Sequence, residues 1–321
     1  RYSTTRRVRK VAPKVVLAEI QAEQKPEDQF ETVLFLPEGE GRQGEGGLRT
    51  KGYFKKSEED KPLITVVTVV FNGEAHLEET ILSVINQTYD NVEYIVIDGA
   101  STDGTVDIIR KYQHAIDYWV SEKDGGIYHA MNKGITLANG KIIGLINSDD
   151  YYLGNTFDYI FYFFNHYDSD IFFGNQLIIN EHLKLKKTVY IEVPTKRNKV
   201  NLNSVHPAVF VDKKIYKKLL FNVDYQIAAD YDFFLRVFDA GYKFKKIEKT
   251  LSIMRIGGAS ASLHYEGVRI KKVHFGLFAA SWHFMKVLKK GIKNFLFELL
   301  YRSDLRKRKA YLKKGWVDFI F

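Results

Sequence analysis

Two adjacent carboxylates follow a strongly apolar segment of the chain. Asp149 and Asp150 come directly after 141–146, a run that predicts a buried strand. In an open α/β sheet, ligands gather beyond the carboxyl ends of the strands, where these two acids would lie. Carboxylate oxygens suit a hard divalent cation, which often fills its remaining positions with substrate phosphate oxygens. Asn, Ser and Asp also form ordinary turns, so the pair alone leaves a solvated turn as the alternative.

Other polar residues that could do chemistry also stand at the ends of apolar segments. Asn72 and Asp98 follow two such runs, and Asp230 stands at the start of a helical pattern further along the chain. A carboxylate can accept a hydrogen bond from an N–H group or take the proton of a hydroxyl group. Each acid also has a structural alternative, since Asp98 and Asp103 suit turns or helix caps and Asp230 suits a helix N-terminus.

The elements that must position these residues alternate regularly from residue 61 onward. The β-branched run 63–70 is typical of a strand buried on both faces, and 91–98 and 116–120 continue the series. Helical patterns separate these strands, and another covers 127–138. Strands that alternate with helices of this length predict a parallel, doubly wound α/β sheet flanked by helices.

Length and composition favour one catalytic domain with appendages. The chain has 321 residues, of which 45% are hydrophobic, and it has no cysteine, which excludes disulfides and thiolate-bound metals. Residues 1–60, with a glycine-rich stretch at 39–49, are predicted to be a lead or linker. The catalytic domain is predicted at 61–264, with a nucleotide-binding half at 61–150 and an acceptor half at 151–264.

Basic charge is concentrated in a C-terminal extension, 265–321. This extension holds 14 lysines and arginines against 4 acids, whereas the rest of the chain is almost neutral. Interleaved aromatic and basic residues predict an amphipathic helix at an anionic membrane surface, or helices packed on the domain with a basic face in solvent. The longest uncharged stretch here, 273–285, has 13 residues, whereas a bilayer span needs roughly 20.

Six segments, in their order and spacing, resemble one protein family. The similar stretch runs from Pro62 to about Ser262. It resembles family 2 glycosyltransferases with the GT-A fold, and most closely the bacterial enzymes that build O-antigen, capsule or colanic-acid-like surface polysaccharides. The resemblance implies a Rossmann-like, mostly parallel sheet, a nucleotide-diphosphate sugar donor and an inverting transfer. The six segments are 65–73, 79–89, 97–105, 124–134, 147–150 and 229–232.

The resemblance implies that the first half holds the donor and a metal ion. Asn72 and Asp98 match positions that contact the nucleotide base and ribose. Asp150 matches the more direct ligand of a divalent cation, Mg²⁺ or Mn²⁺, and Asp149 lies on the ribose side or next to the metal site. Lys133 is a candidate phosphate contact. The implied donor-binding residues are Asn72, Asp98, Ser101, Asp103, Asn132, Lys133 and Asp149.

The resemblance places the catalytic base in the second half. Asp230 matches the carboxylate that takes the proton of the acceptor hydroxyl. His129 departs from the family, where an aspartate is expected, so no role is carried over to it. The glycine-rich segment 257–260 resembles a mobile loop that closes over the donor. Candidates for acceptor or phosphate contacts are His206, Asp232 and Arg255.

These observations predict an inverting glycosyltransferase that uses a nucleotide-diphosphate sugar, with a UDP-sugar favoured. Its acceptor is expected to be a glycan or a lipid-linked oligosaccharide, and the protein is expected in the cytoplasm, peripheral at the inner face of the bacterial membrane. The alternative is a non-catalytic glycan- or nucleotide-binding module of the same fold. A sugar nucleotidyltransferase would need a glycine-rich phosphate loop with Arg or Lys, which 71–74 is not. Nucleic acid is not an expected partner, because no recognised binding motif accompanies the charge.

Overall fold

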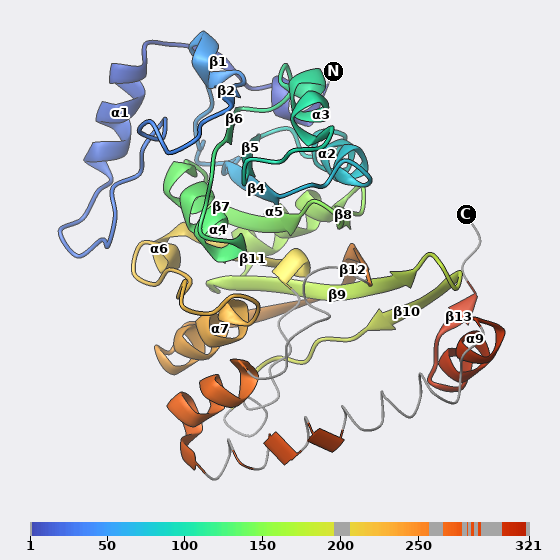
Figure 1. Ribbon diagram of the computed structural model, residues 1–321. Helices are drawn as coiled ribbons and strands as arrows, with labels where there is room; N and C mark the ends of the chain where they lie inside the picture. The colour runs from blue at the N-terminus through green and yellow to red at the C-terminus, as the bar shows by residue number, and fades with distance from the viewer. Residues whose placement is uncertain are drawn as a thin grey trace.

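The computed structural model describes residues 2–195, 206–256, 266–277 and 304–318, with five more between 281 and 289. In these ranges the chain forms a mixed sheet of eleven strands, with helices packed on it (Figure 1). A separate pair of short strands lies near the N-terminus. The segment 257–260, predicted to be a mobile loop, lies outside the described residues.

The first half of the sheet is parallel, as the sequence predicts. The strand order is β7-β4-β5-β6, so the first strand of the series lies in the middle, with β7 and β5 on either side. Every residue of β4 and β5 is buried, as expected for strands covered on both faces. The strands are β4 (Ile64–Val70), β5 (Val92–Asp98), β6 (Tyr118–Ser121) and β7 (Ile142–Asn147). The helices are α2 (Leu77–Ile85), α3 (Thr105–Tyr112) and α4 (Ile127–Leu137).

The second half extends the same sheet with mixed pairing. Strand β11 runs antiparallel to both β7 and β9, whereas β12 is parallel to β9. The strands are β8 (Tyr151–Tyr152), β9 (Ile171–Asn180), β10 (Leu185–Val189), β11 (Val209–Asp212) and β12 (Phe244–Arg255). The helices are α5 (Thr156–His166), α6 (Lys213–Tyr216), α7 (Ala229–Asp239) and the 3₁₀ turn η4 (His206–Ala208).

The N-terminal segment has a larger part in the fold than the linker expected from the sequence. Residues Gly44–Gly46 form β2, which pairs antiparallel with β6 at the edge of the sheet. Arg49 and Lys55 are buried and bond to the carboxylates of Glu93 and Asp117 in the domain. The remaining elements are η1 (Ser3–Thr5), β1 (Arg9–Lys10), α1 (Pro13–Ala22), η2 (Arg49–Lys51) and β3 (Tyr53–Phe54).

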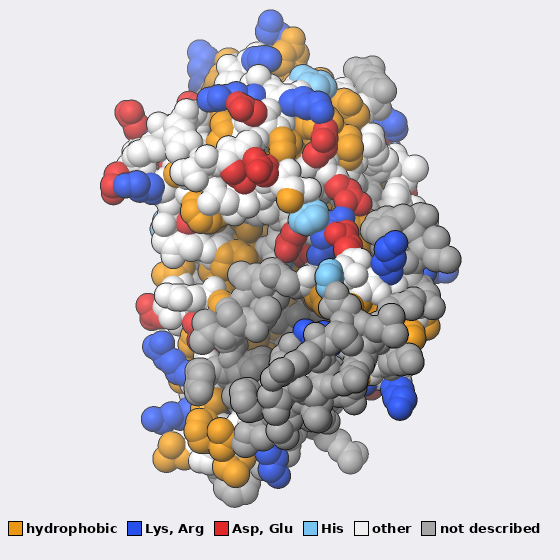
Figure 2. Space-filling model, turned by 45° about the vertical axis from the view of Figure 1, so that its right-hand side comes forward, with side chains coloured by type: hydrophobic (Ala, Val, Ile, Leu, Met, Phe, Trp, Pro, Cys, Tyr) orange, Lys and Arg blue, Asp and Glu red, His pale blue; other side chains and the backbone are white. Residues whose placement is uncertain are grey.

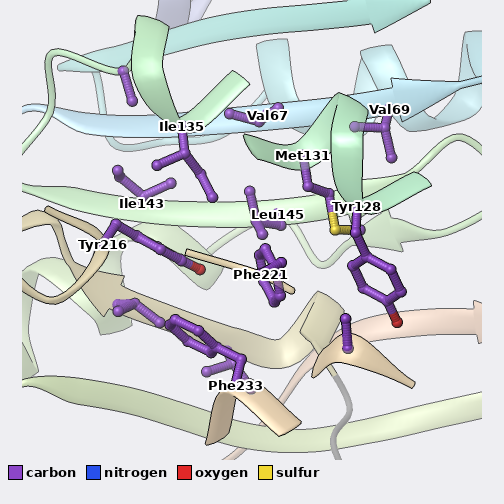
Figure 3. Packing of buried hydrophobic residues seen from close by; sticks show 14 of the residues in the cluster. Val67, Val69, Tyr128, Met131, Ile135, Ile143, Leu145, Tyr216, Phe221 and Phe233 are labelled. Atoms are coloured by element: carbon purple, nitrogen blue, oxygen red, sulfur yellow. The ribbon is translucent and has the colours of Figure 1, made fainter. Parts of the chain in front are cut away.

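Alternate residues of β4 contribute to two hydrophobic clusters, because successive side chains of a strand point to opposite faces. Val66 belongs to the cluster that includes residues of α2, α3 and α5. Val67 belongs to the cluster with residues of α4 and α7 (Figure 3). In this second cluster Phe221 packs against the ring of Tyr128, with 5.4 Å between the ring centroids. This packing fixes α4 and the chain entering α7 relative to the sheet.

The C-terminal extension is helical in part, as predicted, but it also adds a strand. Residues 266–277 are helical, and α9 (Asp304–Lys313) leads to β13 (Val317–Asp318). Strand β13 pairs antiparallel with β10 at the opposite edge of the sheet from β2. In the part of the chain that the structure describes, no helix combines the length and apolarity needed to cross a bilayer.

Candidate active site

The predicted donor residues meet at one edge of the sheet. Asp98 ends β5 and lies in register with Val70 of β4 and Ser121 of β6. Asn147, the last residue of β7, lies in register with Val69 of β4. The loops that follow these four parallel strands therefore emerge side by side. Figure 2 shows acidic, basic and histidine side chains gathered near the middle of one face of the molecule.

Asp98 is fully buried, and other residues of the chain bond to both of its carboxylate oxygens. Oδ1 accepts a hydrogen bond from the Ser101 hydroxyl, and Oδ2 accepts from the Ser101 N–H at 3.0 Å and the Ser121 hydroxyl at 2.5 Å. The Ser101 hydroxyl in turn accepts the N–H of Asn72 at 2.7 Å. The carboxylate thus fixes the loops after β4, β5 and β6 against one another.

Asn72 and Asp103 join the same two loops from the solvent side. Asn72 is exposed and has a positive φ of 51°, and its Oδ1 accepts the N–H of Thr102 at 2.8 Å. Asp103 accepts the N–H groups of Glu74 at 3.2 Å and Thr105 at 3.0 Å. Of the predicted donor residues in these loops, Asn72 is therefore exposed, whereas Asp98 and Ser101 lie beneath it.

The acid pair stands where the sequence predicted it, directly beyond β7. Asp150 is only 2% exposed, and its Oδ1 accepts the backbone N–H of Arg255 at 3.2 Å. The Thr80 hydroxyl of α2 holds this loop by bonding to the carbonyl oxygens of Ser148 and Asp150 at 2.8 and 2.7 Å. Burial and the neighbouring charge of Asp149 raise the pKa of Asp150 well above its usual range. A cation at this position would offset that repulsion.

The residues present fit a divalent cation that shares its ligands with a substrate. Among the described residues there is no group of three or more His, Asp and Glu side chains that could enclose a metal ion. Mg²⁺ is commonly held by one or two carboxylates together with water and substrate phosphates, so Asp149 and Asp150 provide a suitable number of ligands. The amide oxygen of Asn147 is buried beside them and has no hydrogen-bond partner among the described residues.

Arg255 contacts the loop that carries the acid pair Asp149 and Asp150. Its Nε donates to Glu181 at 2.7 Å, its Nη1 to the Asp149 carbonyl at 2.8 Å, and its Nη2 to Glu79. The guanidinium also lies over the ring of Tyr151, 5.0 Å from the centroid. Arg255 was predicted as an acceptor or phosphate contact, and the structure places it where it anchors the acid loop, with two glutamates balancing its charge.

Asn132 and Lys133 of α4 are likewise bound to other parts of the chain. The Asn132 amide exchanges two hydrogen bonds with the backbone of Phe221, at 2.9 and 3.1 Å. The Lys133 ammonium donates to Glu122 at 2.6 Å. Arg42 of the N-terminal segment also bonds to Glu122, at 2.6 Å. These predicted donor residues thus support the loop after β6 and the approach to α7.

Asp230 is the second residue of α7 and is partly open, with its side chain 15% exposed. Its Oδ1 accepts the Tyr128 hydroxyl at 3.3 Å and its own helix's Tyr231 N–H at 2.7 Å. Its Oδ2 lies 3.8 Å from Nδ1 of His206, whose side chain is 16% exposed. Burial and the charge of Asp230 raise the pKa of Tyr128, so the phenol remains a neutral donor. Asp230 and His206, predicted separately, are thus neighbours.

Asp232 faces away from this group. It is 4% exposed and accepts hydrogen bonds from Arg236 at 2.7 Å and from Nε2 of His274 at 2.9 Å. Asp232 was predicted among the acceptor or phosphate contacts, and here it links α7 to the C-terminal helix instead.

Several buried polar atoms of η4, β7, β9 and β12 have no hydrogen-bond partner in the part of the chain that the structure describes. The turn η4, which begins at His206, packs against these three strands. Gln176 of β9 is fully buried with both amide atoms unpaired, and Ser252 lies beside it in register on β12. The sequence analysis did not predict this group. The one feature that could have indicated it is the polar pair Asn175-Gln176 within an otherwise apolar strand. The unpaired atoms are Asn147 Oδ1, Asn175 Oδ1, Gln176 Nε2 and Oε1, His206 Nε2 and Ser252 Oγ.

A pocket of about 220 Å³ opens on the other side of Tyr128. The first turn of α4 and the chain before α7 line it, and His129, which departs from the expected aspartate, forms part of its wall. Tyr225 and Gln226 face His129 from the opposite wall. Because Tyr128 also bonds to Asp230, the pocket and the acid share one side chain.

More than half of the chain matches one enzyme family. The family model described as glycosyl transferase family 2 matches residues 65–238. An uncharacterized glycosyltransferase of Methanocaldococcus jannaschii is 33% identical over 211 residues, which is 62% of this chain and 72% of the relative. The chain belongs to glycosyltransferase family 2, as the sequence predicted, and its catalytic domain is a glycosyltransferase domain.

Two further comparisons extend this result. The putative teichuronic acid biosynthesis glycosyltransferase TuaG of Bacillus subtilis is 36% identical over 93 residues, which is 28% of this chain and 37% of TuaG. S. aureus TarS in complex with UDP-GlcNAc shares the fold, with a TM-score of 0.55 and 18% identity over 66% of this chain and 65% of that one. The chain thus matches less than two thirds of the length of either protein.

Proposed function

We propose that the protein is an inverting glycosyltransferase that moves a sugar from a UDP-sugar to a glycan or lipid-linked acceptor in the synthesis of a bacterial surface polysaccharide. The observation that carries this proposal is the pairing of Asp230 with His206 on η4, a turn that also packs against the end of β7 beside the acids Asp149 and Asp150. The proposed proton acceptor and the acid pair proposed to bind the metal would thereby be held by adjoining elements.

The donor would bind across the ends of β4, β5 and β7. Asn72 would meet the nucleotide, Asp98 and Ser101 would hold the loops that form its floor, and Asp149 and Asp150 would hold the cation. A bound Mg²⁺ or Mn²⁺ would neutralise the charge that develops on the departing diphosphate. The complexes of TarS with UDP and with UDP-GlcNAc support UDP as the nucleotide.

The acceptor hydroxyl would approach from the side of α7. Asp230 would take its proton as the oxygen attacks the anomeric carbon, while the bond from that carbon to the diphosphate oxygen breaks on the opposite face. Base catalysis of this kind contributes about 10²–10⁴-fold. Tyr128 and His206 would hold the carboxylate in place. The unpaired atoms around Gln176 offer neutral donors and acceptors that suit sugar hydroxyls.

The C-terminal extension would keep the enzyme at the cytoplasmic face of the membrane, near a lipid-linked acceptor. Its described residues expose the apolar side chains of Val273 and Leu277, each 68% exposed, and of Leu288, 48% exposed. Lys289 is exposed beside Leu288. Apolar and cationic side chains on one helical segment suit the interface of an anionic leaflet. TuaG, named for teichuronic acid biosynthesis, supports a surface polysaccharide as the product.

The test compares wild type with Asp230→Asn for UDP release from UDP-sugars in the presence of Mn²⁺. We expect turnover to fall about 10²–10⁴-fold, because the amide cannot accept the proton. The rise in melting temperature on adding UDP and Mn²⁺ should be retained, since Asp230 lies outside the donor loops. Chelation of Mn²⁺ should abolish turnover in the wild type.

Two results would contradict the proposal. Undiminished turnover by Asp230→Asn would remove this residue as the base. Stabilisation by UDP and Mn²⁺ without turnover of any UDP- or GDP-sugar by the wild type would instead favour a binding module of the same fold.

A further inference from the structure

The helix at 266–277 packs along α7, the helix that carries Asp230. Its first described residue, Glu266, accepts three successive backbone N–H groups that lead into α7: Gln226 N at 2.7 Å and Ile227 N and Ala228 N at 2.9 Å each. Ala228 is the N-cap residue of α7 and supplies no side-chain hydrogen bond. A residue almost forty positions further along the chain therefore caps the segment that enters α7 and fixes where the helix begins.

A second contact lies two turns further along the C-terminal helix. Nε2 of His274 lies 2.9 Å from Oδ1 of Asp232, which the Arg236 side chain also holds. Between the two contacts, Ile270 is fully buried in the same hydrophobic cluster as Ala229 and Phe233 of α7. Residues four apart lie on one face of a helix, so Glu266, Ile270 and His274 form a continuous inner face.

Asp230 lies between the two points at which this helix holds α7. Glu266 fixes the backbone as far as Ala228, and His274 fixes Asp232, so the position of Asp230 is set from both sides. Given the proposed function, we infer that Glu266 and His274 are positioning residues that aim the Asp230 carboxylate at the acceptor. In the described part of the chain, their hydrogen bonds go to α7 and to the residues that lead into it. The start of the extension is in this sense part of the catalytic half.

The inference predicts a loss of turnover without a loss of donor binding. A displacement of about 1 Å can cost on the order of 10²-fold in rate. For Glu266→Ala we expect kcat for UDP release from UDP-sugars to fall at least tenfold, with KM for the donor and the thermal shift by UDP and Mn²⁺ unchanged. Glu266→Gln keeps an oxygen acceptor without the charge and should fall between Glu266→Ala and the wild type.

Amide hydrogen exchange provides a readout that does not depend on turnover. In Glu266→Ala and His274→Ala, exchange should become faster at 226–232 and stay unchanged in β4 and β5. The matched control is Lys272→Ala, since Lys272 lies on the same helix but is exposed. This control should match the wild type in both exchange and kcat.

Three outcomes separate this inference from the proposed function. Exchange and kcat of Glu266→Ala equal to those of Lys272→Ala would overturn it. Faster exchange at 226–232 with an unchanged kcat would also overturn it, because the contact would then be structural only. If the wild type turns over no nucleotide sugar, the proposed function fails, and the positioning role fails with it even though the cap on α7 persists. If Glu266→Ala unfolds, Glu266→Gln and His274→Ala carry the same test.

Discussion

Two regions of the site differ in whether their buried polar groups have hydrogen-bond partners. The donor edge is formed by the loops after β4 to β7 and by α4, and the acceptor side is formed by α7, η4 and β9. At the donor edge, Asp98, Asn132 and Lys133 already bond to other parts of the chain. On the acceptor side, Nε2 of His206 and both amide atoms of Gln176 are buried without partners among the described residues. An unpaired buried polar group costs free energy, so it indicates a missing partner. Most of the predicted donor residues are thus held before the ligand binds, with the Asn147 amide oxygen as an exception, whereas the acceptor side keeps more hydrogen-bonding capacity for a ligand.

The largest effect on stability is expected when Arg49, a buried cation that bonds to the donor half, is replaced. Arg49 is 1% exposed and donates to Glu93 at 2.7 Å and to the carbonyl oxygens of Leu34 and Leu137 at 3.1 and 2.8 Å. Arg49→Met should lower the free energy of unfolding by about 3–5 kcal/mol, because it leaves the Glu93 carboxylate buried without its cation.

Urea unfolding measures this loss, with Arg110→Met as the control. Arg110 is 51% exposed and pairs with Asp107 at the surface, so its removal should cost less than about 1 kcal/mol. Equal losses for the two variants would show that the N-terminal segment does not stabilise the donor half.

A smaller effect of opposite sign is expected on the acceptor side. Gln176→Leu replaces an unpaired amide by an apolar side chain of similar size, and it should raise the free energy of unfolding by about 1–3 kcal/mol. The same change should lower turnover of UDP-sugars about tenfold, since a sugar hydroxyl would lose its partner. Thermal unfolding and UDP release measure the two effects.

Thr32→Val is the matched control for Gln176→Leu. The Thr32 hydroxyl is also buried and has no partner among the described residues, but it lies in the N-terminal segment. This change should stabilise the protein without altering turnover. Loss of stability in Gln176→Leu would show that the amide already has a partner, and the contrast between the two sides would then fail.

The smallest expected effect is a change, at acid pH, in the stability difference between wild type and Arg49→Met. Burial alone would raise the pKa of Glu93, but the Arg49 guanidinium and hydrogen bonds from Thr65 and Asn139 hold the pKa below its ordinary value of 4.5. A carboxyl group with a lowered pKa contributes stability above its unfolded pKa and loses it as the pH falls through the folded pKa. Without the guanidinium, burial would raise the pKa of Glu93 in Arg49→Met, so the stability gap between wild type and this variant should narrow as the pH falls from above 4.5 to the lowered folded pKa of the wild type. Urea titrations from pH 7 to pH 3 measure it, and a constant gap would contradict the prediction.

The sequence predicted the donor half well because its signals are local. An uninterrupted β-branched run such as 63–70 identifies a strand buried on both faces, and the acids Asp149 and Asp150 follow such a run directly. Parallel strands end at the same edge, so the positions of Asn72 and Asp98 at strand ends already indicated that they would meet. The spacing of the six motif segments indicated the family, because such spacing is also read directly from the sequence.

The second half and the two ends of the chain were less predictable. Strand β2 lies in a segment predicted to be a linker, and strand β13 lies in one predicted to be a helical tail. Both are short and pair with strands that are distant in the chain. Arg255 and Asp232 were predicted as ligand contacts, yet they bond to Glu181 and His274. The type of a single charged residue does not indicate whether its partner will be a ligand or another part of the chain.

The sequence by itself determined the order of strands and helices, the family and the residues able to do chemistry, because periodicity and motif spacing are properties of neighbouring residues. Only the tertiary structure decided which of those residues already bond to other parts of the chain and which remain available to a ligand. It joined Glu266 to the segment that enters α7 and Arg49 to Glu93, and it left Gln176 without a partner in the described part of the chain. Such pairings depend on strand register and helix packing, which bring together residues tens of positions apart.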